Sequence, residues 1–270
     1  GLCTGATIAL FTVLDAVLLR PLPYAGADRL VHVEGDPALR RSVTYPDFVL
    51  LRDHARGFES LAVWQGWTAI MPDAEGVNTR LTGASISPGY FELLGVQPHA
   101  GRFFTAVHVA EGSAKSIVIS HELWRTTFGG TRDIIGRLVR IDTAAYTVIG
   151  VAPAGFQDPL SKRTALWRVE PSLFERGLLQ PGWVGFWMIG RLQAGTTAES
   201  AWREAEGLLA SAYGEVQRGS VRSIATFSSA MVRDVRPTLI ALMAAVALLV
   251  VVGCANLANL FVSRASTRAT

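Results

Sequence analysis

The chain contains two lysines, Lys115 and Lys162, around which a phosphate-binding loop could form. A P-loop needs glycine immediately before its lysine and a second glycine five residues earlier, because backbone amides wrap the phosphates. Lys115 comes nearer to this pattern, yet Ala114 and Val109 stand at the two glycine positions. We therefore predict that this chain holds no ATP and no other cofactor.

Nucleophilic and metal-dependent chemistry also lack their motifs. A nucleophile elbow needs G-x-S-x-G so that the serine sits on a strained turn, and residues 83–87 (GASIS) lack the last glycine. The histidines form neither H-E-x-x-H nor a Cys/His cluster with zinc spacing; they are His32, His54, His99, His108 and His121. The pattern predicts surface or core histidines in a protein that is not an enzyme and has no catalytic, cofactor or metal residues.

Two apolar stretches bound the chain and must position everything between them. Residues 238–262 carry no charge, and such a run of about 25 residues is long enough to cross a bilayer as a helix. Pro237 suits the first turn of that helix, because its missing N–H would have no partner there. A buried core helix is the alternative, but it would usually have a polar face. We predict a transmembrane helix over residues 237–263.

The first stretch, residues 1–20, has Asp15 as its only charge before Arg20. A signal peptide is the alternative, but it would need a basic beginning and a small-residue cleavage site, whereas this run leads into Arg20 and Pro21. Because the chain begins at Gly1 rather than Met, we expect a fragment whose first transmembrane helix is truncated.

Residues 21–236 are then expected to form one soluble domain, which begins and ends at the same membrane face, with two lobes as an open alternative. Arg264 and Arg268 favour a cytoplasmic position for residues 264–270. The expected insertion of the domain between two helices places it outside the cytoplasm.

Polar residues inside the two spans are candidates for helix packing, because a polar side chain in lipid is costly without a partner; these are Asp15, Asn256 and Asn259. An ion or substrate path is the other reading. Prolines at the joints between spans and domain are hinge candidates, namely Pro21, Pro23 and Pro237, although the same residues also simply end helices.

Composition excludes some partners. The net charge is +3, but the arginines are scattered and form no basic stripe, so we expect no nucleic-acid binding. Both cysteines, Cys3 and Cys254, fall in the apolar ends, so the middle has no disulfide of its own.

The middle of the chain interleaves strands and helices, which predicts an α+β (mixed α/β) fold. Strands are expected at residues 30–34, 58–67, 77–85, 116–120, 137–142, 146–151, 165–169, 184–192 and 221–232, and residues 156–161 look irregular.

Helix caps predict where the helices begin. Thr44 with Asp47 has capping-box spacing, and so does Thr196 with Glu199 ahead of a helix to about Tyr213. Ser87 is expected to cap a short helix that Gly95 stops, and Ser120 one that Gly129 and Gly130 end; residues 142–145 are expected to form a hairpin loop rather than a two-residue turn.

Several stretches together resemble one family: residues 15–24 (DAVLLRPLPY), 87–104 (SPGYFELLGVQPHAGRFF), 119–130 (ISHELWRTTFGG), 134–156 (IIGRLVRIDTAAYTVIGVAPAGF) and 253–266 (GCANLANLFVSRAS). They are similar to the MacB/FtsX-like permeases, and more narrowly to the acidobacterial duplicated orphan permease branch. The resemblance covers nearly the whole chain and consists of scaffold motifs.

The resemblance implies a permease subunit in the bacterial inner membrane, with a MacB-like periplasmic core domain and several membrane helices in the intact protein. It implies a separate cytoplasmic ATPase subunit that binds ATP, contact with the lipid bilayer, and a homo-oligomer or repeat partner. A membrane-anchored periplasmic binding or sensor module without transport activity is the alternative, and a membrane-bound enzyme is the third possibility.

Overall fold

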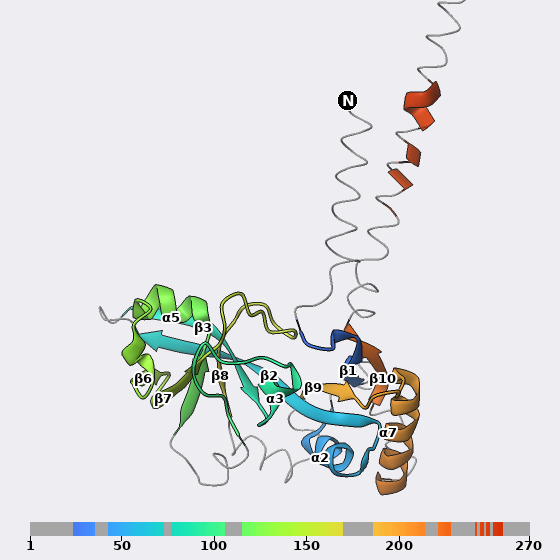
Figure 1. Ribbon diagram of the computed structural model, residues 1–270, viewed down its shortest axis with the longest axis horizontal. Coiled ribbons are helices and arrows are strands. Elements are labelled where there is room, and N and C mark those ends of the chain that lie inside the picture. Colours follow the sequence, from blue (N-terminus) through green and yellow to red (C-terminus); the bar gives the residue numbers. More distant parts are fainter. Residues whose placement is uncertain are drawn as a thin grey trace, which may run out of the picture. The chain divides into compact units, whose positions relative to one another are not determined.

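The computed structural model describes residues 24–35, 43–72, 77–105, 115–169, 186–213, 221–227, 241, 244–245, 247–248 and 251–255 (Figure 1). The chain divides into two units, Tyr24–Thr226 and a second unit of Gly1–Pro23 with Phe227–Thr270. Residues 251–255 of the second unit are helical. Within the described part of the chain, no helix is both long and apolar enough to cross a membrane. The predicted spans lie mostly outside the described residues.

The unit Tyr24–Thr226 is built on a ten-stranded mixed sheet, which confirms the predicted mixed α/β class. The strand order is β10-β1-β9-β2-β3-β8-β5-β7-β4, with β6 paired to β7. Two pairs are parallel, β3 with β8 and β5 with β7, and the others are antiparallel. The strands are β1 (Leu30–Gly35), β2 (Phe58–Pro72), β3 (Asn78–Ile86), β4 (Ala100–Gly101), β5 (Ser116–Ile119), β6 (Leu138–Ile141), β7 (Ala144–Val151), β8 (Thr164–Arg168), β9 (Trp187–Leu192) and β10 (Val221–Thr226).

The helices begin and end largely where local signals place them. They are η2 (Ala27–Arg29), α2 (Tyr45–His54), α3 (Tyr90–Leu93), α5 (His121–Phe128), η3 (Arg132–Ile134) and α7 (Ala198–Tyr213). Thr44 and Asp47 make both bonds of the predicted capping box. The Ser120 hydroxyl accepts from the Leu123 N–H, and Gly129 ends α5 in the left-handed conformation, as predicted.

Two predicted caps are wrong. Ser87 caps no helix, because its hydroxyl accepts a hydrogen bond from the Val63 N–H of β2 at 3.0 Å, and Gly89 with φ of 83° precedes α3 instead. The cap of α7 is Thr197 rather than Thr196: the Thr197 hydroxyl accepts from the Ser200 N–H, while Glu199 pairs with Arg203 one turn on. At Ser87 a hydrogen bond with β2 replaces the predicted cap, and at α7 the neighbouring Thr197 makes the cap in place of Thr196.

The hairpin between β6 and β7 is also tighter than predicted. Ile141 pairs with Ala144, so the turn has two residues, and Asp142 takes a positive φ of 53°. The Asp142 carboxylate accepts from the Ile70 N–H at 2.9 Å, and the Asp142 N–H donates to the Ile70 carbonyl at 2.7 Å. These bonds to β2 hold the turn closed.

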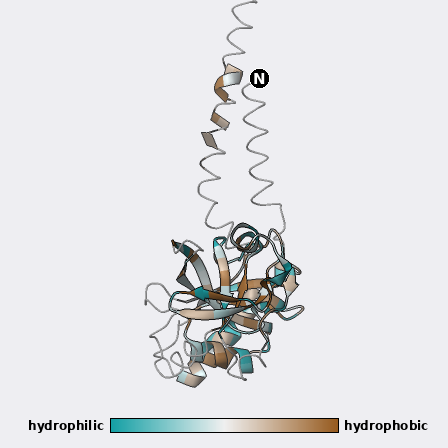
Figure 2. Ribbon diagram, turned by 90° about the vertical axis from the view of Figure 1, so that its left-hand side faces the viewer, coloured by the Kyte–Doolittle hydropathy of each residue, from teal (hydrophilic) through white to brown (hydrophobic). Residues whose placement is uncertain are grey.

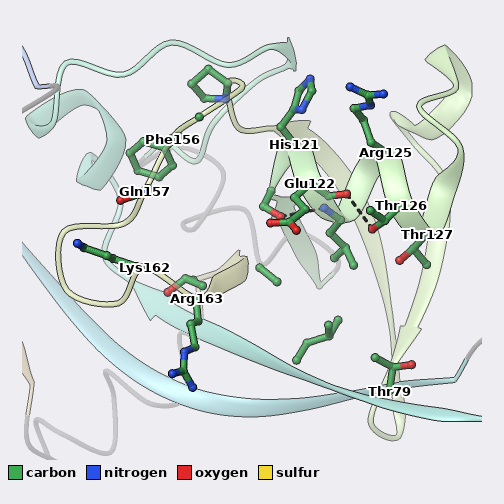
Figure 3. Close-up of a pocket in the computed structure, with 17 residues that line it drawn as sticks. Thr79, His121, Glu122, Arg125, Thr126, Thr127, Phe156, Gln157, Lys162 and Arg163 are labelled. Atoms are coloured by element: carbon green, nitrogen blue, oxygen red, sulfur yellow. Dashed lines mark hydrogen bonds between the residues drawn. The ribbon is translucent and has the colours of Figure 1, made fainter.

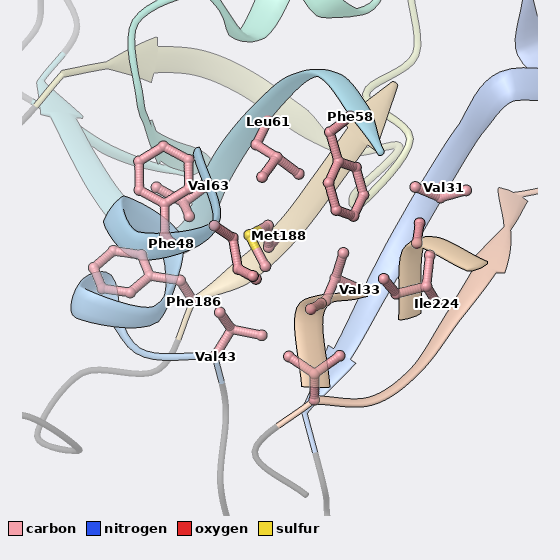
Figure 4. Close-up of a cluster of buried hydrophobic side chains, with 14 of the residues drawn as sticks. Val31, Val33, Val43, Phe48, Phe58, Leu61, Val63, Phe186, Met188 and Ile224 are labelled. Atoms are coloured by element: carbon pink, nitrogen blue, oxygen red, sulfur yellow. The ribbon is translucent and has the colours of Figure 1, made fainter. Parts of the chain in front are cut away.

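Many of the buried side chains among the described residues belong to one of two clusters on this sheet. One lies among β1, β2, β9, β10, α2 and α7 and includes Val33, Phe48, Val63 and Met188 (Figure 4). The other lies among β2, β5 to β8 and α5 and includes Ile117, Leu123 and Ile141. Figure 2 shows hydrophobic and hydrophilic residues intermixed along these elements, as expected where each has one buried face. The long strand β2 contributes to both clusters.

Substitution of Asp142 tests the turn. We expect Asp142→Ala to lower the free energy of unfolding by about 2–3 kcal/mol, because it strains a positive φ and removes the acceptor for Ile70. Asp142→Gly keeps the φ and loses only the acceptor, at roughly 1 kcal/mol, and Asp142→Asn keeps both. Urea unfolding of the purified chain followed by circular dichroism measures this order, and equal stability of the glycine and alanine variants would contradict the argument from φ.

Candidate ligand-binding cleft

An open cleft of about 760 Å³ lies between α5, β3 and the segment from Pro153 to Ala165 (Figure 3). Strand β3 contributes Thr79 and Leu81, and α5 contributes polar side chains that include Glu122, Thr126 and Thr127. Lys162 and Arg163 come from the turn that precedes β8. Among the described residues, the cleft is therefore walled by α5, β3, an irregular segment and the beginning of β8.

The irregular segment is held in place by a buried carboxylate. Asp158 is 2% exposed and its two oxygens accept five hydrogen bonds. One oxygen accepts from the indole N–H groups of Trp167 (2.7 Å) and Trp64 (3.2 Å). The other accepts from the Tyr90 hydroxyl (3.0 Å) and from the backbone N–H groups of Leu160 (2.9 Å) and Ser161 (3.3 Å). The side chain thus joins β2, β8, α3 and its own loop.

Burial governs the protonation of this group. Desolvation raises the pKa of Asp158 above its ordinary value, against the lowering effect of the hydrogen bonds from Trp167, Leu160, Tyr90 and Trp64. Desolvation also raises the pKa of Tyr90 well above its usual range, and the neighbouring Asp158 charge adds to this. Tyr90 therefore remains a neutral donor at physiological pH.

Aromatic rings pack around the same loop. Phe156 lies 5.7 Å from Trp167 and 5.8 Å from Phe91, measured between ring centroids, and Phe91 stacks on Phe103 at 3.9 Å. Because these rings exclude water from the indole side of the cluster, the hydrogen bonds to Asp158 act in a low-dielectric setting. Phe156 of the cleft wall thus packs against Phe91 of α3 and Trp167 of β8.

The start of the domain is bonded to this wall. The Tyr24 hydroxyl donates to the backbone carbonyl of Gln157, next to Asp158, and its ring lies edge-on to Phe156. Desolvation, with the Asp158 charge, raises the pKa of Tyr24. Buried Arg191 of β9 donates to the carbonyls of Ala25 (2.7 Å), Gly26 (3.2 Å) and Leu93 (2.6 Å).

The side chains of two histidines lie close together at the beginning of α5, although the residues are far apart in the sequence. The His99 and His121 rings lie 5.0 Å apart, and each lies close to Trp124. Desolvation, followed by the charges of His99 and Arg125, lowers the pKa of His121. Within the described residues there is no group of three or more His, Cys, Asp or Glu side chains that could hold a metal ion.

His121 and Lys162, named in the sequence analysis, line this cleft, whereas none of the predicted helix-packing and hinge residues can be placed in it. These helix-packing and hinge residues all lie outside the described parts of the chain: Asp15, Pro21, Pro23, Pro237, Asn256 and Asn259. Sequence reasoning missed Asp158, which is the only acid between Asp142 and Glu170. The sequence did offer one signal for Asp158: it is a lone acid in an otherwise apolar and basic stretch, within the segment predicted to be irregular.

Replacement of Asp158 tests its structural role. In Asp158→Asn the amide group must face at least one existing donor, so we expect the variant to lose roughly 2–4 kcal/mol of stability. Thermal unfolding of the chain should then shift down by about 5–15 °C, whereas Asp28→Asn, at an exposed carboxylate, should change the midpoint by less than about 2 °C. An unchanged midpoint for Asp158→Asn would rule out this role.

Comparisons with known proteins agree with this fold. The periplasmic region of MacB from Actinobacillus actinomycetemcomitans is similar, with 14% identity, a TM-score of 0.58, and coverage of 77% of this chain and 92% of that chain. The extracellular domain of the noncanonic ABC-type transporter YknZ from Gram-positive bacteria is also similar, with 19% identity, a TM-score of 0.54, and coverage of 70% and 97%. No curated protein sequence matches the chain.

The family model described as the MacB-like periplasmic core domain matches residues 1–208. This match spans most of the chain and confirms the predicted relationship to MacB/FtsX-like permeases. The chain therefore belongs to the MacB-like periplasmic core domain family of ABC transporter permeases.

Proposed function

We propose that the chain is part of a permease subunit that couples a cytoplasmic ATPase to its periplasmic domain, for export or for transmission of force. In this proposal residues 1–20 and 237–263 cross the inner membrane, and residues 21–236 lie in the periplasm. ATP binds to a separate subunit, and a second copy or repeat completes the assembly. The acidobacterial duplicated orphan permease branch is the narrower family that we propose.

The observation that carries the proposal is the bonding of the domain's first residues. Tyr24 is tied to Gln157, and Ala25 and Gly26 are tied to Arg191. A chain held by these bonds cannot swing freely at its entry, so a displacement of Tyr24 acts on β9 and on the loop around Asp158. The cleft wall is the part of the domain that this displacement reaches first.

The exit of the domain lies beside its entry. Strand β10, the last of the unit, pairs with β1, the first, from Val31 opposite Thr226 to Gly35 opposite Val221. Both tethers therefore pull on adjacent, hydrogen-bonded strands. This supports a lever that responds to the relative movement of two helices, with Pro21, Pro23 and Pro237 proposed as its joints and Asp15, Asn256 and Asn259 as helix contacts.

The open cleft favours a second candidate, a membrane-anchored periplasmic binding or sensor module without transport activity. Such a module would need a ligand site, which the cleft offers, but no response to nucleotide. Nucleotide dependence therefore separates the two candidates.

Flexible insertions test the lever. We would insert about ten Gly/Ser residues before Tyr24, which keeps its contacts within the domain, and another such segment before Asp234. In nanodiscs with the ATPase bound, hydrogen exchange over residues 154–164 should respond to a non-hydrolysable ATP analogue in the unmodified chain. The two insertions should abolish that response.

A matched control carries the same insertion in the exposed turn at residues 194–195, which leaves both tethers intact, and should keep the response. The lever would be refuted by an undiminished nucleotide response in the doubly inserted chain. Absence of any nucleotide response in the unmodified complex would favour the binding or sensor module.

A further inference from the structure

A second cleft, of about 570 Å³, continues the first one along α5. Thr79, Thr126 and Thr127 line both clefts, so the two form one groove between α5 and β3. We call this the α5–β3 groove. Its far end is lined by Met71 and Pro72 of β2 and by residues 137–140 next to and within β6. Figure 3 shows Thr79 on β3 below Thr126 and Thr127 of α5.

Part of one edge of β3, at residues 78–81, has no strand beside it in the described part of the chain. Strand β8 pairs with β3 only from Thr82 to Ser85, whereas β2 pairs with β3 along its whole length. Residues 78–81 therefore have β2 as their sole sheet partner in the described part of the chain, and Thr79 and Leu81 line the groove. An unpaired strand edge presents backbone N–H and C=O groups to any extended chain that lies beside it.

The groove is strongly cationic. Its lining includes Arg125, Lys162 and Arg163 in the first cleft and Arg137 and Arg140 in the second. Among the described residues, Glu122 is the one acid in the lining of these two clefts. The ion pairs found among the described residues lie elsewhere: Arg29–Glu59, Arg52–Asp53 and Arg203–Glu199. The guanidinium carbon of Arg137 lies over the Phe128 ring, 5.6 Å from its centroid.

Two exposed apolar residues belong to this region: Leu138 lines the second cleft, and Val77 immediately precedes β3. Leu138 is 67% exposed and Val77 is 62% exposed, so both side chains can contact an occupant. An occupant with alternating acidic and aliphatic side chains would satisfy both the charges and these residues. An extended polypeptide has this alternation, and it also supplies the backbone groups that a strand edge pairs with.

We propose that the α5–β3 groove binds an extended acidic peptide segment, which adds to the open edge of β3 at residues 78–81. Its carboxylates meet Lys162 and Arg163 at one end and Arg140 at the other. A nucleic acid or a small anion would match the charge but could not pair with the strand edge. The inference uses the domain's geometry and does not depend on coupling to an ATPase.

The probe is a fluorescent peptide of about eight residues with alternating Glu and Val, which spans roughly 26 Å when extended. We expect saturable binding to the full chain in detergent, followed by fluorescence anisotropy. A Lys/Val peptide of the same length should bind at least tenfold more weakly. Lys162→Glu with Arg163→Glu should weaken the acidic peptide by roughly tenfold, in line with the loss of two ionic contacts.

Backbone pairing is tested separately with two N-methylated peptides. Each carries methyl groups on one alternate set of amides, so one set faces β3 and the other faces away. We expect one of these peptides to lose binding at least tenfold while the other keeps it. Equal binding of both N-methylated peptides and the parent peptide would overturn the strand-edge proposal in favour of attraction by charge alone.

The matched control for charge is Arg56→Glu with Arg102→Glu, two exposed arginines that line neither cleft. This control should bind the acidic peptide as the unmodified chain does. Equal weakening in the control and in the groove variant, or no binding by the unmodified chain, would overturn the proposal. If the double glutamate variant fails to fold, Lys162→Gln with Arg163→Gln takes its place, and the N-methylation test needs no variant.

Discussion

The Asp158 carboxylate lies where β2, β8 and α3 meet, almost fully removed from water. Burial of such a group carries a large desolvation cost unless every lone pair is satisfied. Here two indoles, one phenol and two backbone amides converge on it. The donors come from residues far apart in the chain, so the carboxylate fixes three elements and its own loop relative to one another. The cleft wall takes its shape from this arrangement.

The same arrangement connects the site to the beginning of the domain. The backbone carbonyl of Gln157, next to Asp158, accepts a hydrogen bond from the Tyr24 hydroxyl. Arg191 donates to the carbonyls of Ala25 and Gly26. The Arg191 bonds restrain the backbone at Ala25 and Gly26, and the Tyr24 hydroxyl restrains the backbone at Gln157. Entry segment, buried carboxylate and cleft wall form a continuous set of contacts, which gives the proposed lever a physical route through the domain.

Local signals in the sequence predicted local structure well. The caps at Thr44 and Ser120 and the stop at Gly95 are correct because the bonds they make lie within a few residues. Ser87 and the turn at Asp142 were mispredicted because each makes a hydrogen bond to β2, and Thr196 because the adjacent Thr197 makes the cap. The role of Asp158 was not predicted because it also depends on a partner that is distant in sequence: Trp64 lies 94 residues away. The residues predicted from the membrane spans fall outside the described parts of the chain.

The buried Asp158 carboxylate accepts hydrogen bonds from the indole N–H groups of both Trp64 and Trp167 and thereby holds the cleft wall in place. Nuclear magnetic resonance of the indole N–H groups tests it most directly, with exposed Trp187 as internal reference. The account predicts that Trp64 and Trp167 exchange with solvent far more slowly than Trp187, and that both resonances shift together in a single titration above the ordinary aspartate pKa. Fast exchange of either indole, or separate titrations of the two, would contradict it.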